Sequence, residues 1–329
     1  MKPRVVLRAD AGSSIGFGHF VRTTALAAYL RDDFECVVAT RNPDTGRPTP
    51  YQLSLIEEAD ALPSDLTGGE RGEFDAAFLD DLMPDDIVVL DNYYYPAEYQ
   101  SEIRTRCRAL VCIDDVHDRH FVSDVVMTFC PLDREDFSME DYTRFYGGIK
   151  WSFLREPFLA PARQRTSGTV RRIAMAMGGA DPFGLTDRYI ALLRRIAPDV
   201  VLDVLAGQTV RVSYQQDQRL HIWRRADAKT IAEIFDNADL GIFPASTVCV
   251  EAFSRRLPIA AGHYVDNQEE FYAYGVEHGW FAPLGCMLDD DAQIERRLAP
   301  ILSADMPAPA SDFDFRRSRR EIINIFKSL

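Results

Sequence analysis

Short runs of apolar residues, separated by longer amphipathic stretches, recur along the whole chain of 329 residues. Apolar runs of this length, without alternating polar residues, are typical of parallel β-strands that helices cover on both faces. The alternation starts again in the second half of the chain, and each half has the size of an ordinary domain. We therefore expect an α/β protein of two Rossmann-like domains, residues 1–161 and 162–329, facing a central cleft.

The expected strands of the first half are Arg4–Arg8, Glu35–Thr40, Ile87–Leu90, Leu110–Ile113 and Val125–Phe129, with helices at Thr23–Leu30 and Tyr99–Arg108. Those of the second half are Ile173–Met177, Val200–Leu205, Leu220–Trp223, Leu240–Phe243, Ile259–Ala261 and Trp280–Pro283, with helices at Thr186–Ile196, Ala228–Asn237, Val248–Ser254 and Asn267–His278. A last helix, Phe313–Phe326, closes the chain.

Two segments fit this alternation less well. Residues 41–86 contain Pro43, Pro48, Pro50 and Pro63 and the pair Gly68-Gly69, which we expect to break any long element. Residues 137–171 read as the connection between the domains, since they contain Pro157 and Pro161 and end in a polar, basic run.

Acidic residues outnumber basic ones by 51 to 37, which gives a formal net charge of −14. Such a charge argues against non-specific binding to nucleic acid or to an anionic membrane. The sequence shows no apolar run of transmembrane length and no signal peptide. Its six cysteines are scattered without zinc-site spacing and are expected to be buried, reduced thiols. We expect a cytoplasmic protein, a monomer, with neither nucleic acid nor membrane as partner.

No metal site is expected either. The acidic cluster at Asp80-Asp81 and Asp85-Asp86 is interpreted as a solvated loop. His117 and His120 stand near Asp114-Asp115, but these residue types are common in such loops, and a metal cluster is the less favoured interpretation.

The segment from Arg8 to Arg22 is the first candidate site. It runs from an apolar strand through a turn with Gly12, Gly16 and Gly18 into a helix, and His19 lies where the helix begins. Ligands of open α/β sheets bind at the carboxyl ends of strands, and a helix N-terminus favours an anion. A common packing unit in which His19 only satisfies its neighbours is the structural alternative. The glycine spacing fits neither a P-loop nor the dinucleotide fingerprint, so the turn predicts a site without naming its ligand.

Other strands also end in candidate residues. Asp10, Asp91-Asn92 and Asp114-Asp115 follow strands of the first half. In the second half, paired glycines at 178 and 179 expose backbone N–H groups. The hydroxyls and N–H groups of Ser246 and Thr247 suit a pyrophosphate, with Glu251 placed for ribose hydroxyls. Asn267 and Gln268 stand at the start of a later expected helix and can orient a diphosphate or a sugar. All four polar side chains before a helix could instead cap it, and a helix dipole alone stabilises a nearby carboxylate.

Several of these motifs occur in a specific order. Arg8-Ala-Asp, Ile15-Gly-Phe-Gly-His-Phe-Val-Arg22, Met177-Gly-Gly-Ala-Asp181, Ser246-Thr-Val-Cys-Val-Glu251 and Asp266-Asn-Gln268 follow one another. Together they resemble the family of UDP-2,4-diacetamido-2,4,6-trideoxy-β-L-altropyranose hydrolases of pseudaminic acid biosynthesis. The C-terminal half is also similar, more broadly, to the nucleotide domain of glycosyltransferase-B enzymes, including the glycosyltransferase of lipid II synthesis.

The resemblance implies a nucleotide held by the C-terminal domain and sugar chemistry at the N-terminal one. Water would attack the anomeric carbon with inversion and release UDP, without a metal or other cofactor. His19 would be the general base, since an ordinary imidazole has a pKa of about 6.5, near the working pH. Asp10 would orient the imidazole or bind the sugar, and Arg8 or Arg155 would stabilise the departing UDP. The resemblance assigns substrate binding to Gly16, Gly18, Arg22, Asn92, Tyr93, Arg155, Gly178, Gly179, Ser246, Thr247, Glu251, Asn267 and Gln268.

One position departs from the family. The expected pattern Asp-His-Tyr after the third N-terminal strand is here Asp91-Asn92-Tyr93, and Asn92 cannot titrate as a histidine would. This departure bears on the identity of the sugar more than on the reaction class. Two alternatives remain: a glycosyltransferase of the same fold, in which His19 activates an acceptor hydroxyl, and a non-catalytic nucleotide-sugar-binding protein.

Overall fold

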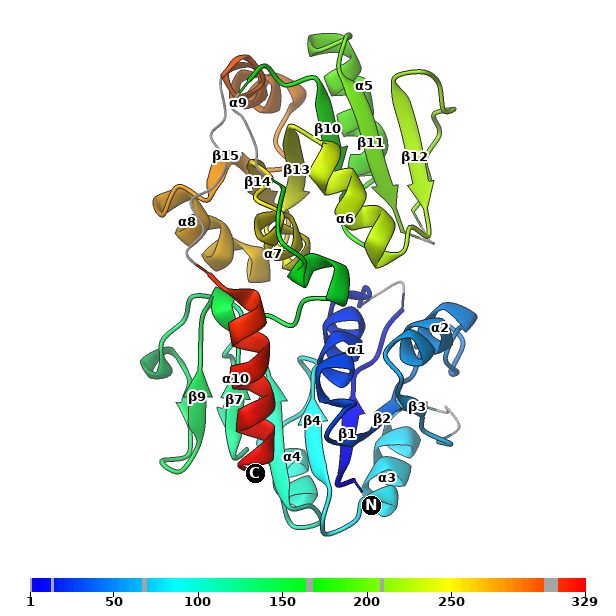
Figure 1. Cartoon of the computed structure of the whole chain (residues 1–329), viewed down its shortest axis with the longest axis vertical. Helices are drawn as coiled ribbons and strands as arrows, with labels where there is room; N and C mark the ends of the chain where they lie inside the picture. The colour runs from blue at the N-terminus through cyan, green and yellow to red at the C-terminus, as the bar shows by residue number, and fades with distance from the viewer. Residues whose placement is uncertain (1, 13–14, 67–69, 164–167, 208–209, 305–312) are drawn as a thin grey trace. The chain divides into compact units, whose positions relative to one another are not determined.

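The structure is a computed structural model that describes residues 2–12, 15–66, 70–163, 168–207, 210–304 and 313–329 (Figure 1). The chain forms two compact units. Unit 1 comprises Met1–Arg155 together with Asp314–Leu329, and unit 2 comprises Glu156–Phe313. Each unit contains a parallel sheet with helices on both faces, which confirms the expected α/β class. Part of the polar run before the second half, residues 164–167, lies outside the described residues.

The central sheet of unit 1 has seven strands in the order β3-β2-β1-β4-β5-β7-β9, and its paired strands all run parallel. A separate parallel pair is formed by β6 and β8. The strands are β1 (Arg4–Arg8), β2 (Glu35–Ala39), β3 (Leu62–Pro63), β4 (Ile87–Leu90), β5 (Ala109–Ile113), β6 (His120–Phe121), β7 (Val125–Met127), β8 (Ser138–Met139) and β9 (Arg144–Tyr146).

Within the described residues of unit 1, five α-helices accompany this sheet. They are α1 (Gly18–Leu30), α2 (Pro50–Glu58), α3 (Arg71–Asp81), α4 (Ala97–Arg104) and α10 (Phe315–Lys327), with short 3₁₀ turns η1 (Arg134–Asp136) and η2 (Ile149–Trp151). Val6 and Val88 of the sheet pack against Phe74 and Phe78 of α3 and Ile103 of α4. Helix α1 contacts β1, α2 and α10.

Unit 2 has a six-stranded parallel sheet in the order β12-β11-β10-β13-β14-β15. Its strands are β10 (Arg172–Met175), β11 (Val201–Ala206), β12 (Leu220–Arg224), β13 (Leu240–Pro244), β14 (Ile259–His263) and β15 (Phe281–Cys286). Its helices are α5 (Leu185–Ile196), α6 (Ala228–Asn237), α7 (Thr247–Ser254), α8 (Glu269–Glu277) and α9 (Asp291–Ser303), with 3₁₀ turns η3 (Glu156–Leu159) and η4 (Asp266–Gln268).

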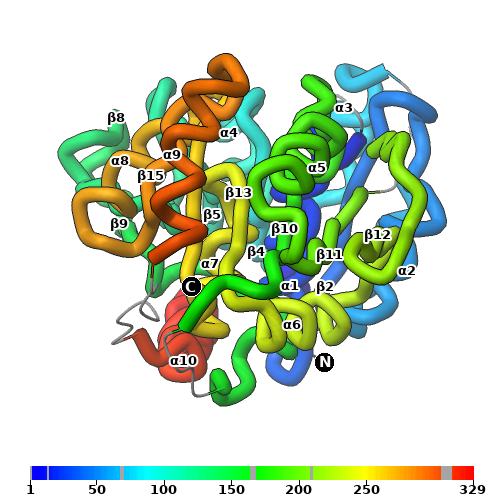
Figure 2. Tube along the Cα trace, turned by 90° about the horizontal axis from the view of Figure 1, so that it is seen from above, coloured from blue at the N-terminus to red at the C-terminus, as the bar shows by residue number. Residues whose placement is uncertain are grey.

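Helices cover both faces of the unit 2 sheet. Leu193 of α5 and Leu298 of α9 join one core with Ile173 and Ile242 of the strands. On the other face, the α6 ring of Phe235 meets Phe243 of β13 at a centroid distance of 5.4 Å. Figure 2 shows α5 and α9 on one side of β10, β11 and β13, and α6 on the other. The near-continuous apolar strands seen in the sequence are explained by this two-sided burial.

Each main sheet reverses its strand order at one place. In unit 1 the chain moves outward from β1 through β2 to β3 and then returns to add β4 on the other side of β1. In unit 2 it moves from β10 through β11 to β12 and returns to add β13 beside β10. A crevice opens at the carboxyl ends of the strands at such a switch point. We therefore expect ligand-binding residues at the carboxyl ends of β1 and β4 in unit 1 and of β10 and β13 in unit 2.

The division of the chain differs from the sequence expectation of 1–161 and 162–329. The first segment of unit 1 ends at Arg155, because η3 already packs on unit 2, where Phe158 contacts Phe235 and the guanidinium of Arg255 donates to the Ala160 carbonyl at 2.8 Å. The final helix was expected in the C-terminal domain, and this was wrong: α10 belongs to unit 1.

Residues 41–86, where no long element was expected, contain α2 and α3. Pro50 occupies the first turn of α2, where a missing N–H and a fixed φ do no harm, and Thr49 and Gln52 cap the helix reciprocally. The acidic cluster is only partly solvated. Asp86 is 1 % exposed and accepts hydrogen bonds from Arg4 Nε at 2.8 Å and Arg4 Nη2 at 2.7 Å. Within the described residues, no helix is both long and apolar enough to cross a membrane.

Helix α10 packs its apolar side on unit 1, and Phe326 is 1 % exposed. Replacing Phe326 by Ala should lower the free energy of unfolding of unit 1 by about 3–5 kcal/mol, because a large buried ring leaves a cavity. Asn324→Ala, on the exposed side of the same helix, should change it by less than about 0.5 kcal/mol. Denaturant unfolding and amide hydrogen exchange of β1 and β4 measure the difference. Equal effects of the two changes would contradict the packing of α10 on unit 1.

Candidate active site

The candidate site of unit 1 lies at the β1/β4 switch point. His19 is the second residue of α1, which follows β1, and Asp91 directly follows β4. The strands pair in register, Arg8 with Leu90, so the residues after them emerge side by side. The fold thus brings together two polar residues that are 72 positions apart in the sequence.

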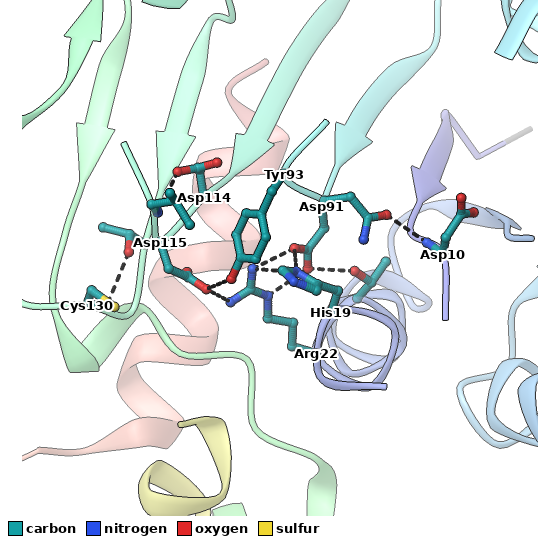
Figure 3. Close-up of polar contacts among 12 residues, drawn as sticks. Asp10, His19, Arg22, Asp91, Tyr93, Asp114, Asp115 and Cys130 are labelled. Atoms are coloured by element: carbon teal, nitrogen blue, oxygen red, sulfur yellow. Dashed lines mark hydrogen bonds and ion pairs between the residues drawn. The ribbon is translucent and has the colours of Figure 1, made fainter. Parts of the chain in front are cut away.

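His19 and Asp91 form a hydrogen-bonded pair (Figure 3). The His19 Nδ1 atom lies 2.7 Å from Asp91 Oδ1, and the carboxylate is fully buried. Because a carboxylate can only accept hydrogen bonds, this contact is a hydrogen bond when the proton is on Nδ1; Arg22 Nη2 also lies 3.0 Å from the same nitrogen. The neutral imidazole then carries its free lone pair on Nε2, which makes Nε2 the atom able to accept a proton.

Arg22, one helical turn after His19 in α1, holds the Asp91 carboxylate in place. Its Nε donates to Asp91 Oδ2 at 2.7 Å and its Nη2 to Asp91 Oδ1 at 2.6 Å, while its Nη1 reaches Asp115 Oδ2 at 2.6 Å. Thr23 adds a hydroxyl donor to Asp91 Oδ2 at 2.9 Å. Asp91, Arg22 and Asp115 together form a buried ionic chain beneath His19.

The charge of Asp91 is secured by this chain. Burial by itself would raise the pKa of the carboxyl group, but the charges of Arg22 and His19 and their hydrogen bonds outweigh burial and lower the pKa to about 2. Asp91 is therefore ionised at neutral pH. An ionised carboxylate at Nδ1 orients the ring and favours the imidazolium that forms when Nε2 takes a proton.

Tyr93 lies beside this pair. Its ring meets the His19 ring edge-on, with centroids 4.4 Å apart, and its hydroxyl donates to Asp115 Oδ2 at 3.1 Å. The same Asp115 oxygen also accepts from Arg22, so Tyr93 and Arg22 share one anchor. This holds the imidazole ring in a fixed direction.

Asp10 was expected to orient the imidazole or bind the sugar, but the residue that orients His19 in the structure is Asp91. Asp10 is 1 % exposed and accepts hydrogen bonds from the Arg8 guanidinium, the Tyr94 hydroxyl and the Arg41 backbone N–H. Burial and the nearby Asp10 raise the pKa of Tyr94 above its usual value, which keeps this hydroxyl a donor. Through these hydrogen bonds Asp10 links residues at the carboxyl ends of β1, β2 and β4.

Two expected substrate-binding residues, Arg22 and Asn92, and the neighbouring Arg8 also have partners within unit 1. Arg22 is 5 % exposed and is paired with Asp91 and Asp115, so its assignment to the substrate stays a prediction. Asn92, also 5 % exposed, accepts the Asp10 backbone N–H at 2.8 Å. Arg8 is fully buried against Asp10 and Asp75, so it is not the arginine that stabilises a departing UDP.

The glycine turn precedes His19. Gly16 has a φ of +74°, which favours glycine, and exchanges two backbone hydrogen bonds with Gly12. Gly18 begins α1, and a Cβ added there would meet no atom within 4 Å. Between the two bonded glycines, Ser13 and Ser14 lie outside the described residues. Arg155, half-buried, ends the first segment of unit 1.

In unit 2 the two expected phosphate-binding motifs meet at the β10/β13 switch point. Gly178 and Gly179 follow β10, and Ser246 and Thr247 begin α7 after β13. Gly178 has a φ of +87°, and a Cβ there would lie 2.7 Å from the Tyr264 hydroxyl, so only glycine fits. The motifs come from neighbouring parallel strands, which places both at one crevice.

The other candidate residues of unit 2 lie at α7 and in η4. Ser246 is the N-cap residue of α7, yet its side chain makes no capping hydrogen bond among the described residues, and Glu251 follows on the second turn of that helix. Asn267 is exposed in η4. Gln268 is 8 % exposed and accepts the Tyr264 backbone N–H at 3.0 Å. Its assignment to the substrate therefore competes with a structural role.

The contacts of Asp91 and Asp115 in the candidate site were not foreseen from the sequence. Both had been noted as polar residues after strands, but only the strand order shows which of these ends adjoin His19. Elsewhere, Asp114 accepts backbone N–H groups from Val116 and His117, and His120 contacts Ser138 and Glu140. Within the part of the chain that the structure describes, no group of three or more His, Cys, Asp or Glu side chains is arranged to hold a metal ion.

No protein-family model matches the chain, and no curated protein sequence matches it either. Solved structures do match. The UDP-GlcNAc 2-epimerase of Methanocaldococcus jannaschii, in complex with UDP-GlcNAc and UDP, gives a TM-score of 0.66 at 12 % identity, with 100 % of each chain covered. UGT89C1 of Arabidopsis thaliana gives 0.61 at 11 %, and MurG of Acinetobacter baumannii 0.59 at 15 %, each covering 99 % of both chains.

At these identities the likeness shows the fold. The chain has the glycosyltransferase-B fold of two Rossmann-like domains, as the sequence predicted.

The lowered pKa of Asp91 gives a test of the ionic chain beneath His19. A carboxyl group whose pKa is lower in the folded than in the unfolded state stabilises the fold above its unfolded pKa, and this stability is lost as the pH falls through the folded pKa. Asp91→Asn should therefore be destabilising at pH 7, and its deficit should narrow by about 2 kcal/mol between about pH 5 and pH 2.

Urea unfolding of both proteins across this pH range measures the deficit. Asp32→Asn is the matched control, because Asp32 is exposed at the end of α1. A deficit that stays constant with pH would show that Asp91 is not held ionised by its neighbours.

Proposed function

We propose that this protein is a hydrolase that cleaves the sugar–diphosphate bond of a UDP-linked diacetamido-trideoxy sugar in nonulosonic (pseudaminic-type) acid biosynthesis. The observation that carries the proposal is the His19–Asp91 pair at the β1/β4 switch point. An ionised, buried carboxylate that fixes the Nδ1 proton of a histidine is the arrangement that general-base catalysis uses. The order of the motifs in the sequence, which resembles the hydrolase family, supports the substrate class.

In the proposed reaction, His19 Nε2 takes a proton from water as the water oxygen bonds to the anomeric carbon. The bond between that carbon and the phosphate oxygen breaks, and its electron pair leaves with UDP. Attack opposite the leaving group inverts the anomeric configuration. The imidazolium that results is stabilised by the Asp91 carboxylate at its Nδ1–H. This scheme uses neither a metal nor another cofactor.

The proposal assigns UDP to unit 2. Among the described residues, the N–H groups of Thr247 and Val248 come before the first backbone hydrogen bond of α7, from the Cys249 N–H to the Ser246 carbonyl at 2.9 Å. With the helix dipole, this helix start suits an anion in a protein whose net charge is −14. The backbone of Gly178 and Gly179 would add donors to the diphosphate. Glu251 would accept hydrogen bonds from ribose hydroxyls, and Asn267 would contact the nucleotide or sugar.

Asn92 separates this chain from the expected family pattern. In place of a titratable histidine, its side-chain oxygen accepts the Asp10 backbone N–H and so joins the ends of β1 and β4. The proposed acid–base chemistry therefore rests on His19 alone. This difference affects the identity of the sugar more than any other part of the proposal. We also propose that the enzyme is cytoplasmic and monomeric and binds its UDP-sugar from solution.

A panel of UDP- and CMP-sugars, incubated with the protein and followed by NMR, tests the function. Release of UDP without any acceptor, with inversion at the anomeric carbon, is expected for a diacetamido-trideoxy sugar. Release of UDP only when an acceptor alcohol is added would show a glycosyltransferase, in which His19 deprotonates the acceptor hydroxyl. Binding without release would show a nucleotide-sugar-binding protein.

Replacing His19 should separate catalysis from binding. His19→Asn keeps a side-chain N–H donor near Asp91 but has no basic nitrogen, and turnover should fall about 10²- to 10⁴-fold. The dissociation constant for UDP should stay within about twofold, since UDP is assigned to unit 2. His120→Asn, at an exposed histidine of unit 1, is the control and should leave both quantities unchanged. Near-normal turnover of His19→Asn would make His19 structural.

Glu251→Ala should weaken UDP binding about 10-fold, because the ribose hydroxyls lose a charged hydrogen-bond acceptor. Isothermal titration calorimetry with UDP measures the change, and titration with uridine-free pyrophosphate is the control, since pyrophosphate lacks the ribose. An unchanged dissociation constant for UDP would remove Glu251 from the nucleotide site.

A further inference from the structure

Exposed apolar side chains lie in loops at the carboxyl end of the unit 2 sheet. Phe183, in the loop after β10, is 53 % exposed, and Val265, in the loop after β14, is 38 % exposed. The ring of Tyr264, the residue before Val265, lies edge-on to the Phe183 ring at a centroid distance of 5.8 Å. Strand β13 lies between β10 and β14 in the sheet (Figure 1), so both loops follow strands that adjoin β13.

Single exposed apolar residues are common on soluble proteins, so exposure alone says little. The loop that carries Phe183 has a well-defined backbone conformation. Asp181 has a φ of +45° and Gly184 a φ of +66°, values in the left-handed region that aspartate and glycine tolerate. The Asp181 carboxylate accepts the N–H groups of Leu185 and Thr186, at 2.8 Å each. These hydrogen bonds hold the loop on the start of α5 and so fix the position of Phe183.

Tyr264 is held against the glycine turn. The Tyr264 hydroxyl donates to the Met177 carbonyl at 3.2 Å, and its backbone N–H donates to Gln268 Oε1 at 3.0 Å. Because a Cβ on Gly178 would lie 2.7 Å from the same hydroxyl, Tyr264 touches the turn whose N–H groups are assigned to the diphosphate. Tyr264 thus connects the exposed Phe183 ring to the proposed phosphate site.

From these contacts we propose that Phe183 and Val265 form an apolar platform for the sugar of the nucleotide sugar. The inference rests on the proposed function. The sugar is bonded directly to a phosphate of the diphosphate group, whereas the base is separated from the phosphates by the ribose. An aromatic ring beside the phosphate-binding turn is therefore best placed for the sugar.

The chemistry of the platform also favours the sugar over the base. A uracil edge needs hydrogen-bond partners, and the side chains of Phe183 and Val265 have no polar atom to offer one. The C–H face of a sugar ring and the methyl groups of acetamido and 6-deoxy substituents are apolar, and a large exposed ring buries them well. The platform thus contributes to selection for deoxy and acetamido sugars over fully hydroxylated ones.

Calorimetry in the His19→Asn background, in which turnover is expected to be slow, tests the platform. The two probes are UDP and UDP-2,4-diacetamido-2,4,6-trideoxy-β-L-altropyranose. Phe183→Ala should weaken binding of the UDP-sugar about 10-fold and binding of UDP by less than twofold. Phe183→Leu, which keeps apolar bulk, should recover part of the loss. Leu62→Ala, at a 54 % exposed leucine of unit 1, should change neither constant.

Each other outcome has a distinct meaning. If Phe183→Ala weakens UDP and the UDP-sugar equally, while thermal unfolding is unchanged, the ring does not recognise the sugar and the platform is refuted. If neither constant changes, Phe183 lies outside the site, and the proposed function stands without the platform. If the parent His19→Asn protein binds neither probe, the proposed function itself fails, and the platform fails with it.

Discussion

The ion pair between Arg22 and Asp91 is the interaction on which the first unit's candidate site depends. Burying a carboxylate without partners is strongly unfavourable, and this one is satisfied by donors from Arg22, Thr23 and His19. Those donors come from α1 and the acceptor from the end of β4, so the pair also joins two elements across the switch point. Positioning of the imidazole and attachment of the helix to the sheet are therefore one physical arrangement, and neither can change without the other.

The sequence predicted most strands because apolar runs that are buried on both faces carry a strong signal. Pro50 shows where this reasoning failed: a proline counted as a helix breaker stands at the first position of α2, where it is favourable. Helix α9 was not predicted, although its buried residues Ile294, Leu298 and Ile301 show helical spacing and Pro300 is accommodated inside it. For α2, the position of the proline within the helix mattered more than its presence.

The candidate site was predictable in part. The glycine turn and His19 are local in sequence and could be found there, but the partner of His19 is set by strand order. Asp10 and Asp91 both follow strands, and they look equivalent in the sequence. Only the structure shows that Asp10 is taken up by Arg8 and Tyr94 while Asp91 faces the imidazole. Side-chain partnership across a parallel sheet depends on tertiary contacts, which a linear pattern does not contain.

The return of α10 to the first unit has a consequence for synthesis of the chain. Unit 2 is one continuous segment, Glu156–Phe313, whereas unit 1 is made of two segments that enclose it in sequence. Domains generally fold as units while the ribosome is still adding residues, and here the middle of the chain can complete its own core first. The earlier segment gains its contact between α1 and α10 only after the last helix has been synthesised. Topologically, unit 2 is an insertion into unit 1.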